Sequence, residues 1–261
     1  MDVEELRAAF SELPFVDEQP PDYTWKRHRW EIIRHAKNDD PEHFLRWSTI
    51  QATMFPGETK WLLRELDELR LSDDWPRWAK VIEEPFFGDP SPMPSCGWTS
   101  GNLIHQAYHL FMWEVATGRK LYDLGYIYEF GGGYGAMAMV AVRAGFSGDY
   151  FIQDVPEISL LQEYYLSNVG VNAILTTETL DMEADLLIGC YSFSEIPIEL
   201  RESVLAKVKG RSYLFAYQDV FYEVDNYGWF REFAKRRDDL TWHEIHVEHL
   251  PGRYYLMGAE Q

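Results

Sequence analysis

The segment Glu129-Phe-Gly-Gly-Gly-Tyr-Gly135 has the residue types that a ligand-binding turn requires. Glycine has no Cβ atom, so it lets the backbone turn sharply and approach a ligand closely. The N–H groups at the start of a following helix add a polar cradle. We therefore predict that Glu129, Gly131, Gly133 and Gly135 bind a cofactor. The alternative is a glycine turn that binds no ligand.

The neighbouring elements are predicted to place this segment at the carboxyl end of a strand. Residues 126–129 are rich in aromatic and β-branched types, which is typical of a buried strand, and residues 136–143 have the composition of a helix. A second strand is predicted to begin at Asp149 and to end in the carboxylate of Asp154. A carboxylate there suits the two hydroxyls of a cofactor ribose, so we predict this role for Asp154. The alternative for this residue is a loop or helix entry before Pro156.

Two classes of cofactor fit this arrangement. The spacing Gly131-x-Gly133-x-x-Ala136 satisfies the dinucleotide pattern, which indicates NAD(P) or FAD. The spacing Glu129-x-Gly131-x-Gly133-x-Gly135 instead resembles the first motif of class I methyltransferases, which use S-adenosylmethionine. That resemblance implies that the acidic residue lies near the methionine amino group and that the glycines pass beneath the cofactor.

The order of the later elements favours the methyltransferase. Helices are predicted over residues 156–168, 197–208 and 227–237, and strands over residues 172–175, 185–191 and 212–218. The last two strands, residues 241–249 and 253–258, are joined by a short turn and must be antiparallel neighbours. A dinucleotide-binding domain would continue with parallel crossovers. We predict an α/β fold for residues 121–261: the Rossmann-like, seven-stranded sheet of class I methyltransferases, with its last strand antiparallel.

Within that class, the chain more narrowly resembles the sugar O-methyltransferase family. Besides the glycine segment, the resemblance rests on Asp154-Val-Pro-Glu157 with Gln162–Leu166, on Ser192-Phe-Ser-Glu-Ile-Pro197 and, more faintly, on Ser100–His109. Together these motifs cover roughly residues 99 to 220. The resemblance implies transfer of a methyl group from S-adenosylmethionine to a hydroxyl of a sugar or saccharide.

Methyl transfer to an alcohol requires a group that removes the hydroxyl proton. The segment after the fourth strand is predicted to face the reacting methyl, because cofactors bind at the carboxyl ends of parallel strands. We therefore predict that Tyr191 and Ser192 bind substrate and that Glu195 accepts the proton or orients a hydroxyl. The alternative for Glu195 is to cap the helix that begins near Pro197.

A histidine pair is the second candidate for proton transfer. Ser100 is a predicted N-cap, and the helix over residues 103–113 projects His105 and His109 from one face. Histidine titrates near neutral pH, so either residue is a candidate base, and Tyr108 beside them is predicted to bind substrate. The alternatives are structural histidines, or a zinc pair that lacks a third ligand. His243, His246 and His249 are assigned structural roles.

A magnesium site is a weaker hypothesis. Some O-methyltransferases hold magnesium with carboxylates near the end of the fifth strand, which makes Asp219 and Asp225 candidates here. Magnesium prefers oxygen ligands and keeps water in its shell, so the pattern leaves metal dependence open.

Residues 1–120 differ in composition and in sequence pattern from the rest of the chain. Eight of the ten tryptophans precede residue 114, and amphipathic stretches such as residues 61–70 alternate with proline-rich breaks. The densest break runs from Pro85 to Pro94 and indicates an ordered linker or a lid edge. We predict a helical cap that builds the acceptor pocket and a homodimer surface; the alternative for each tryptophan is plain core.

Composition narrows the function further. The net charge of −19 argues against nucleic acid as a partner, because such binding relies on Lys and Arg; the clusters 26–29 and 235–237 are predicted to be solvated helix faces. The two cysteines, the absence of a long apolar run and the acidic start lead us to expect a cytoplasmic protein without a membrane segment. Three rivals remain: a methyltransferase for a non-sugar small molecule, an NAD(P)-dependent oxidoreductase, and a non-enzymatic partner of another protein.

Overall fold

A seven-stranded sheet forms the centre of the computed structural model, which describes residues 1–14 and 25–260. The strands lie in the order β12 (Leu240–His246), β13 (Arg253–Glu260), β9 (Ser212–Gln218), β7 (Leu186–Cys190), β3 (Tyr126–Phe130), β4 (Asp149–Gln153) and β5 (Ile174–Thr176). The five strands from β9 to β5 are parallel, and β13 is antiparallel to both of its neighbours. The seventh strand of this sheet in chain order thus lies between the fifth and the sixth. This arrangement confirms the predicted Rossmann-like fold of the class I methyltransferase type.

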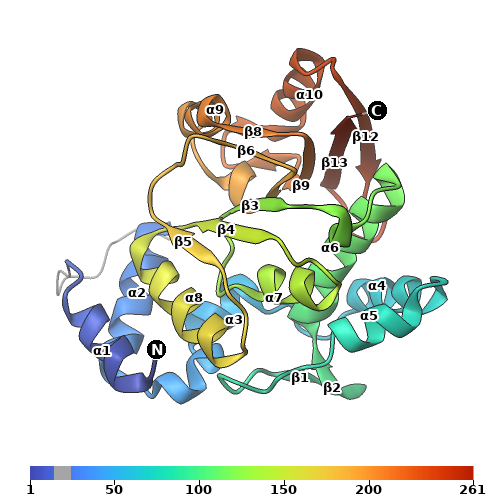
Figure 1. Cartoon of the computed structure of the whole chain (residues 1–261). Coiled ribbons are helices and arrows are strands. Elements are labelled where there is room, and N and C mark those ends of the chain that lie inside the picture. The colour runs from blue at the N-terminus through green and yellow to red at the C-terminus, as the bar shows by residue number, and fades with distance from the viewer. Residues whose placement is uncertain (15–24, 261) are drawn as a thin grey trace.

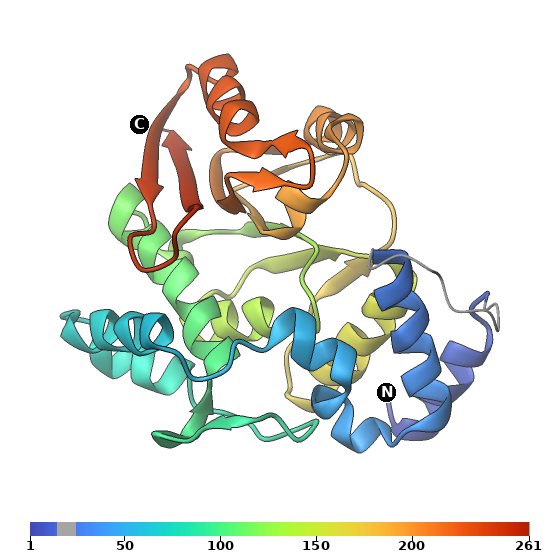
Figure 2. The same cartoon turned by 180° about the vertical axis from the view of Figure 1, so that it is seen from behind.

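Helices cover both faces of the sheet (Figures 1 and 2). On one face, α6 (Gly101–Thr117), α7 (Ala136–Arg143) and α8 (Pro156–Asn168) share an apolar core with strand residues such as Ile127 and Ile188. On the other face, α9 (Ile198–Lys207) and α10 (Asn226–Arg236) pack against Tyr128, Leu187 and Phe215. Successive residues of a strand point to opposite faces, which is why the central strands are apolar throughout.

The N-terminal part of the chain is mostly helical, as predicted. It contains α1 (Val3–Ser11), α2 (Trp25–Asn38), the 3₁₀ helix η1 (Pro41–Arg46), α3 (Ser48–Met54), α4 (Lys60–Leu71) and α5 (Trp75–Val81). The proline-rich break leads into a small hairpin, β1 (Pro92–Met93) and β2 (Cys96–Ser100), which the sequence pattern did not indicate. The predicted division at residue 120 stays a prediction, because one apolar core includes residues on both sides of it.

Several boundaries differ from the predicted ones. Helix α6 extends to Thr117, where Gly118 ends it at a φ of 68°. Strand β12 ends at His246 instead of His249, because residues 247–252 form a turn in which the Leu250 N–H donates to the Val247 carbonyl. The pattern also missed the short elements η2 (Leu121–Asp123), β6 (Met182–Ala184), η3 (Ser192–Glu195), β8 (Val208–Gly210), β10 (Val220–Phe221) and β11 (Val224–Asp225).

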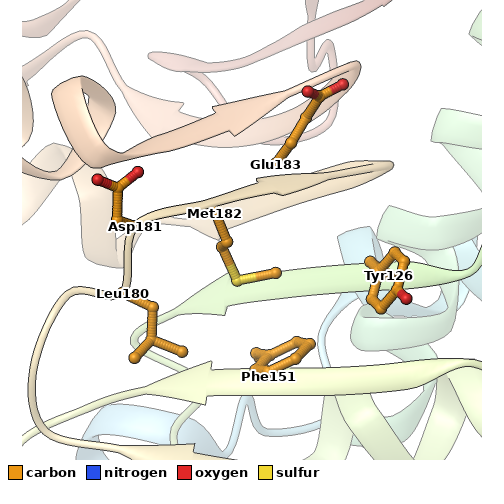
Figure 3. A pocket seen from close by; sticks show the side chains of 6 residues that line it. All are labelled: Tyr126, Phe151, Leu180, Asp181, Met182 and Glu183. Atoms are coloured by element: carbon orange, nitrogen blue, oxygen red, sulfur yellow. The ribbon is translucent and has the colours of Figure 1, made fainter.

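A hollow of about 430 Å³ lies between β6 and the sheet, on the face that α9 and α10 cover elsewhere. The residues that line it are Tyr126, Phe151, Leu180, Asp181, Met182 and Glu183 (Figure 3). Tyr126 is the first residue of β3, so this hollow does not include the glycine segment at the other end of that strand. In the described part of the chain, no helix is both long enough and apolar enough to cross a membrane.

Candidate active site

The glycine segment forms a turn that only glycine accommodates without strain. Gly131, Gly133 and Gly135 lie in the left-handed region, with φ angles of 73°, 56° and 97°. A Cβ atom on Gly131 would also lie 2.3 Å from the Cβ atom of Ser192, in the turn after β7. The Ser192 hydroxyl donates to the Phe130 carbonyl, so the two turns are in direct contact. The segment therefore lies where the strand order reverses between β3 and β7, which is the place at which open α/β sheets bind ligands.

Two carboxyl groups lie close together beneath this turn. Glu129 is 4% exposed, and its Oε2 accepts a hydrogen bond of 2.9 Å from the Tyr150 hydroxyl. Asp154, directly after β4, accepts hydrogen bonds from the Val155 N–H at 2.8 Å and from Gln162 Nε2 at 3.0 Å. Burial, together with the charge of Asp154, raises the pKa of Glu129 to about 8. Enclosure of its own carboxyl raises the pKa of Asp154 to about 7.

Neither carboxyl group has a basic partner in the part of the chain that the structure describes. Among residues 1–14 and 25–260, no Lys, Arg or His forms a salt bridge with Glu129 or Asp154. A carboxylate that is buried without a counter-charge is costly, which is why both pKa values are raised. The site is therefore electrostatically suited to a ligand that carries positive charge, and ill suited to one that carries a pyrophosphate.

The raised pKa of Glu129 leads to a stability prediction. A carboxyl whose pKa is higher in the folded than in the unfolded state destabilises the fold progressively as pH rises from about 4.5 to about 8. Glu129→Gln keeps an acceptor for the Tyr150 hydroxyl but cannot ionise. We expect the free energy of unfolding of this variant, relative to the unsubstituted protein, to rise by about 2 to 4 kcal/mol between pH 5 and pH 8.5. Urea unfolding of both ligand-free proteins across this range measures the difference; a constant difference would contradict the burial argument.

The N-terminal helices cover the glycine segment. Met54, the last residue of α3, has its sulfur 3.3 Å from the position that a Cβ of Gly133 would take. The next residue, Phe55, stacks on Tyr134 with the ring centroids 5.8 Å apart and the planes 8° from parallel. The cap therefore lies directly over the predicted cofactor turn.

Helix α2 reaches two further turns at the same edge of the sheet. Trp25 Nε1 donates to Glu195 Oε2 at 3.0 Å, which ties the start of α2 to the turn after β7. Arg29, from the basic cluster of α2, forms a salt bridge with Glu157 at the start of α8. Since Glu157 is 1% exposed, Arg29 is more than a solvated charge. The cap thus contacts the same edge of the sheet as the cofactor turn, and the acceptor pocket stays a prediction.

Glu195 does not cap the helix that follows it. Pro197 is the N-cap of α9 and no side chain donates or accepts there, so the capping alternative is wrong. Burial raises the pKa of Glu195, while the hydrogen bonds from Trp25 and Gln218 and the charge of Arg253 oppose that rise. Glu195 is thus a half-buried carboxyl in the turn after β7 that accepts hydrogen bonds from Trp25, at 3.0 Å, and from Gln218.

The histidine pair meets the β7 turn at Tyr191. The rings of His105 and His109 have centroids 4.2 Å apart, and the His105 ring stacks at 6.1 Å from that of Tyr191. His105 Nδ1 lies 2.8 Å from Glu65 Oε2, and His109 Nδ1 lies 2.6 Å from the Tyr255 hydroxyl. Two of the predicted catalytic residues and one predicted substrate residue are therefore brought together.

The two histidines differ in their surroundings. His109 is 1% exposed, and burial and the neighbouring His105 hold its pKa well below the usual range. Its Nε2 is buried and has no hydrogen-bond partner in the described structure. His109 is therefore neutral, whereas His105, 9% exposed, reaches solvent at its edge.

The hydroxyl groups of Tyr108 and Ser192 are already hydrogen-bonded within the protein. The Tyr108 hydroxyl donates to Glu68 Oε2 at 2.5 Å, on the side of α6 that faces α4, and the residue is 3% exposed. The Ser192 hydroxyl is occupied by the Phe130 carbonyl. Their predicted contact with substrate stays a prediction.

Sequence reasoning missed Glu65 and His249. Glu65 lies on the buried face of α4 with Leu62, Leu66 and Leu69, and is 0% exposed. A carboxylate among the apolar positions of an amphipathic helix was the signal that could have found it. His249 was placed on a strand but lies in the β12–β13 turn, where its Nε2 is 3.1 Å from Glu65 Oε1.

The two aspartates proposed for magnesium have other partners. Asp225 caps α10 by accepting from the Gly228 N–H at 2.9 Å, and Asp219 accepts from the Val220 N–H at 2.8 Å. Nowhere in the part of the chain that the structure describes do three His, Cys, Asp or Glu side chains form a group that could hold a metal ion. The magnesium hypothesis therefore has no support.

No family model and no curated protein matches the sequence. Among solved structures, magnesium protoporphyrin IX methyltransferase from Synechocystis PCC 6803 with bound SAH is 14% identical, with 77% of this chain and 100% of that chain covered and a TM-score of 0.48. An O-methyltransferase family protein from Burkholderia thailandensis is 12% identical, with 77% of this chain and 71% of that chain covered and a TM-score of 0.44. The mitomycin 7-O-methyltransferase MmcR is 13% identical, with 86% of this chain and 74% of that chain covered and a TM-score of 0.43. Similarity at this level is confined to the general fold, and the class I methyltransferase fold is assigned from the strand order itself.

Proposed function

We propose that the protein is an S-adenosylmethionine-dependent O-methyltransferase. The observation that carries the proposal is the pair of enclosed carboxyl groups, Glu129 and Asp154, beneath a glycine turn and without a basic partner. S-adenosylmethionine carries a sulfonium and an ammonium group, so its charge complements these carboxyls. A dinucleotide would bring the negative charge of its pyrophosphate to the same place, which disfavours the NAD(P)-dependent rival.

The residues present fit this cofactor. Asp154 directly follows β4, where a carboxylate accepts the hydroxyls of a ribose, and Glu129 is the penultimate residue of β3, where we expect the ammonium group of the cofactor. Gly131 and Gly133 add no side chain of their own to the turn, which lets Ser192 and Met54 pack closely against its backbone. When bound, the cofactor supplies an electrophilic methyl group for in-line transfer to an oxygen.

Proton transfer falls to the groups around Tyr191. The ring of His105, from α6, stacks on Tyr191, and Glu195 lies in the β7 turn itself, so both are groups that can accept a proton at this turn. We assign the role of base to His105 and the role of orienting the acceptor hydroxyl to Glu195. The neutral His109 supports the ring of His105 from behind.

A sugar or saccharide is the acceptor class that we propose. The resemblance of three sequence motifs to sugar O-methyltransferases supports it, and so do the aromatic rings of Trp25, Phe55 and Tyr191 at this edge, since such rings pack on the C–H faces of sugars. The net charge of −19 disfavours nucleic acid. A non-sugar small molecule is the second candidate for the same site.

Calorimetric titration of the full chain with S-adenosylmethionine and S-adenosylhomocysteine tests the cofactor. We expect micromolar dissociation constants, and a loss of at least about tenfold in Asp154→Asn, because two charge-assisted hydrogen bonds to the ribose are weakened. Asp149→Asn is the matched control: it lies at the exposed amino end of the same strand and should bind like the unsubstituted protein. NAD and NADP are titrated as comparison ligands. Binding of either of these two without binding of S-adenosylmethionine or S-adenosylhomocysteine would overturn the proposal. If none of the four ligands binds, the non-enzymatic rival is favoured.

A further inference from the structure

Glu65 connects three segments that are far apart in the sequence. Its side chain is 0% exposed, and each carboxylate oxygen faces a histidine: His105 Nδ1 of α6 at 2.8 Å and His249 Nε2 of the β12–β13 turn at 3.1 Å. Trp61, one turn earlier on α4, covers the edge of the His105 ring at a centroid distance of 5.1 Å. A buried carboxylate held between two imidazoles is therefore built into the wall of the candidate active site.

The carboxyl group is ionised in this setting. Burial opposes ionisation, but the charge and hydrogen bond of His105 and the hydrogen bond of His249 outweigh it, so the pKa of Glu65 is lowered. An ionised carboxylate can only accept hydrogen bonds, and each imidazole nitrogen that faces it must therefore carry a proton. When His105 gives up one of its two ring protons, the proton that faces Glu65 therefore stays on Nδ1 and the lone pair is on Nε2.

The free nitrogen of His105 is placed for proton transfer. Within the described residues His105 forms its hydrogen bond through Nδ1 and none through Nε2, and its ring stacks on Tyr191 directly after β7. The neighbouring His109 also has an Nε2 without a partner in the described structure, but that nitrogen is buried, and burial lowers the pKa of the ring. Without a carboxylate on Nδ1, the imidazole of His105 would distribute its proton between both nitrogens.

We propose that Glu65 is a positioning residue, which holds His105 in the tautomer whose Nε2 accepts the proton of the acceptor hydroxyl. His249 completes the arrangement by donating to the second oxygen, which fixes the carboxylate between α6 and the β12–β13 turn. The catalytic purpose of this tautomer rests on the proposed methyltransferase function, whereas the tautomer itself is a property of the chain alone.

Glu68, one turn after Glu65 on α4, also connects α4 to α6 and allows a purely structural role to be tested. Glu68 accepts from the Tyr108 hydroxyl at 2.5 Å and pairs with Arg64 at 2.9 Å, and it faces no histidine. Glu68→Gln therefore removes a carboxylate that ties the same two helices without touching His105. It is the matched control for Glu65→Gln.

Long-range proton–nitrogen NMR of the imidazole groups of the full-length protein tests the tautomer without any ligand. The chain has eight histidines, and the loss of one set of signals in His105→Gln assigns the residue of interest. We expect His105 to be protonated on Nδ1 in the unsubstituted protein and in Glu68→Gln, and to become a mixture of tautomers in Glu65→Gln. A proton on Nε2 of His105 in the unsubstituted protein would overturn the proposal even if Glu65→Gln does not fold, as would an unchanged tautomer in Glu65→Gln.

The catalytic part is tested by methyl transfer from labelled S-adenosylmethionine to a panel of methyl glycosides. We expect kcat to fall by about 100-fold in Glu65→Gln, with KM changed less than about threefold and with partial recovery in Glu65→Asp. An equal fall in Glu65→Gln and Glu68→Gln would contradict positioning. Calorimetry of Glu65→Gln with the cofactor should match the unsubstituted protein. If neither Glu65→Gln nor the unsubstituted protein binds the cofactor, the methyltransferase function is refuted. The tautomer proposal is then judged by NMR alone.

Discussion

Gly131→Ala is expected to abolish cofactor binding and to lower the free energy of unfolding by about 2 to 4 kcal/mol. Two separate effects add up at this position. A φ of 73° costs an alanine about 1 kcal/mol or more, and the new Cβ would overlap the Cβ of Ser192 at 2.3 Å. Both Cβ atoms are bonded directly to the backbone, so the overlap can be removed only if the turns after β3 and β7 move apart. That movement would displace the residues that form the cofactor turn.

The chain offers a control that isolates the backbone effect. Gly170, after α8, has the same φ of 73°, but a Cβ there would meet nothing within 4 Å. Gly170→Ala should therefore lose only about 1 kcal/mol and should bind the cofactor normally. The double variant Gly131→Ala, Ser192→Gly removes the overlap and should recover most of the additional loss.

Urea unfolding and calorimetric titration of these three variants separate the two effects. If Gly131→Ala and Gly170→Ala lose equal stability, the contact between the β3 and β7 turns is not a constraint. If Gly131→Ala binds the cofactor as the unsubstituted protein does, the turn is not part of the cofactor site.

The local parts of this architecture could be predicted from the sequence. The helices over residues 136–143 and 156–168 and the strand over residues 212–218 have the predicted bounds, because apolar runs between glycine or proline breaks determine them locally. The antiparallel position of β13 followed from the shortness of its turn to β12. The glycine segment and Asp154 came together because parallel strands end at one edge of a sheet.

The parts that could not be predicted depend on contacts between distant segments. Glu65 and His249 are 184 positions apart, and no local pattern relates them. The bond between Trp25 and Glu195, 170 positions apart, likewise depends on how the cap packs on the sheet. The strand prediction that included His249 failed because alternation of apolar residues continues past His246, while the backbone has already turned. Periodicity identifies faces of elements, but it does not say which faces meet.

The second large effect is expected at the histidine pair, where the two residues should differ in kind. His105→Gln should lower kcat for methyl transfer by about 100-fold or more, because the glutamine has no basic nitrogen to offer at the β7 turn. Glutamine retains a donor for Glu65, so the buried carboxylate keeps a partner and the fold should lose less than about 2 kcal/mol.

His109→Gln should show the opposite pattern. His109 is 1% exposed, is neutral and bonds to Tyr255, so its replacement disturbs packing more than proton transfer. We expect a loss of about 1 to 3 kcal/mol in the free energy of unfolding and a kcat within about tenfold of the unsubstituted protein. Urea unfolding and single-turnover methyl transfer to the best glycoside of the panel measure both quantities. A larger fall in kcat for His109→Gln than for His105→Gln would assign the role of base to His109. Glu65 would then have a structural role at the site and would not position the base.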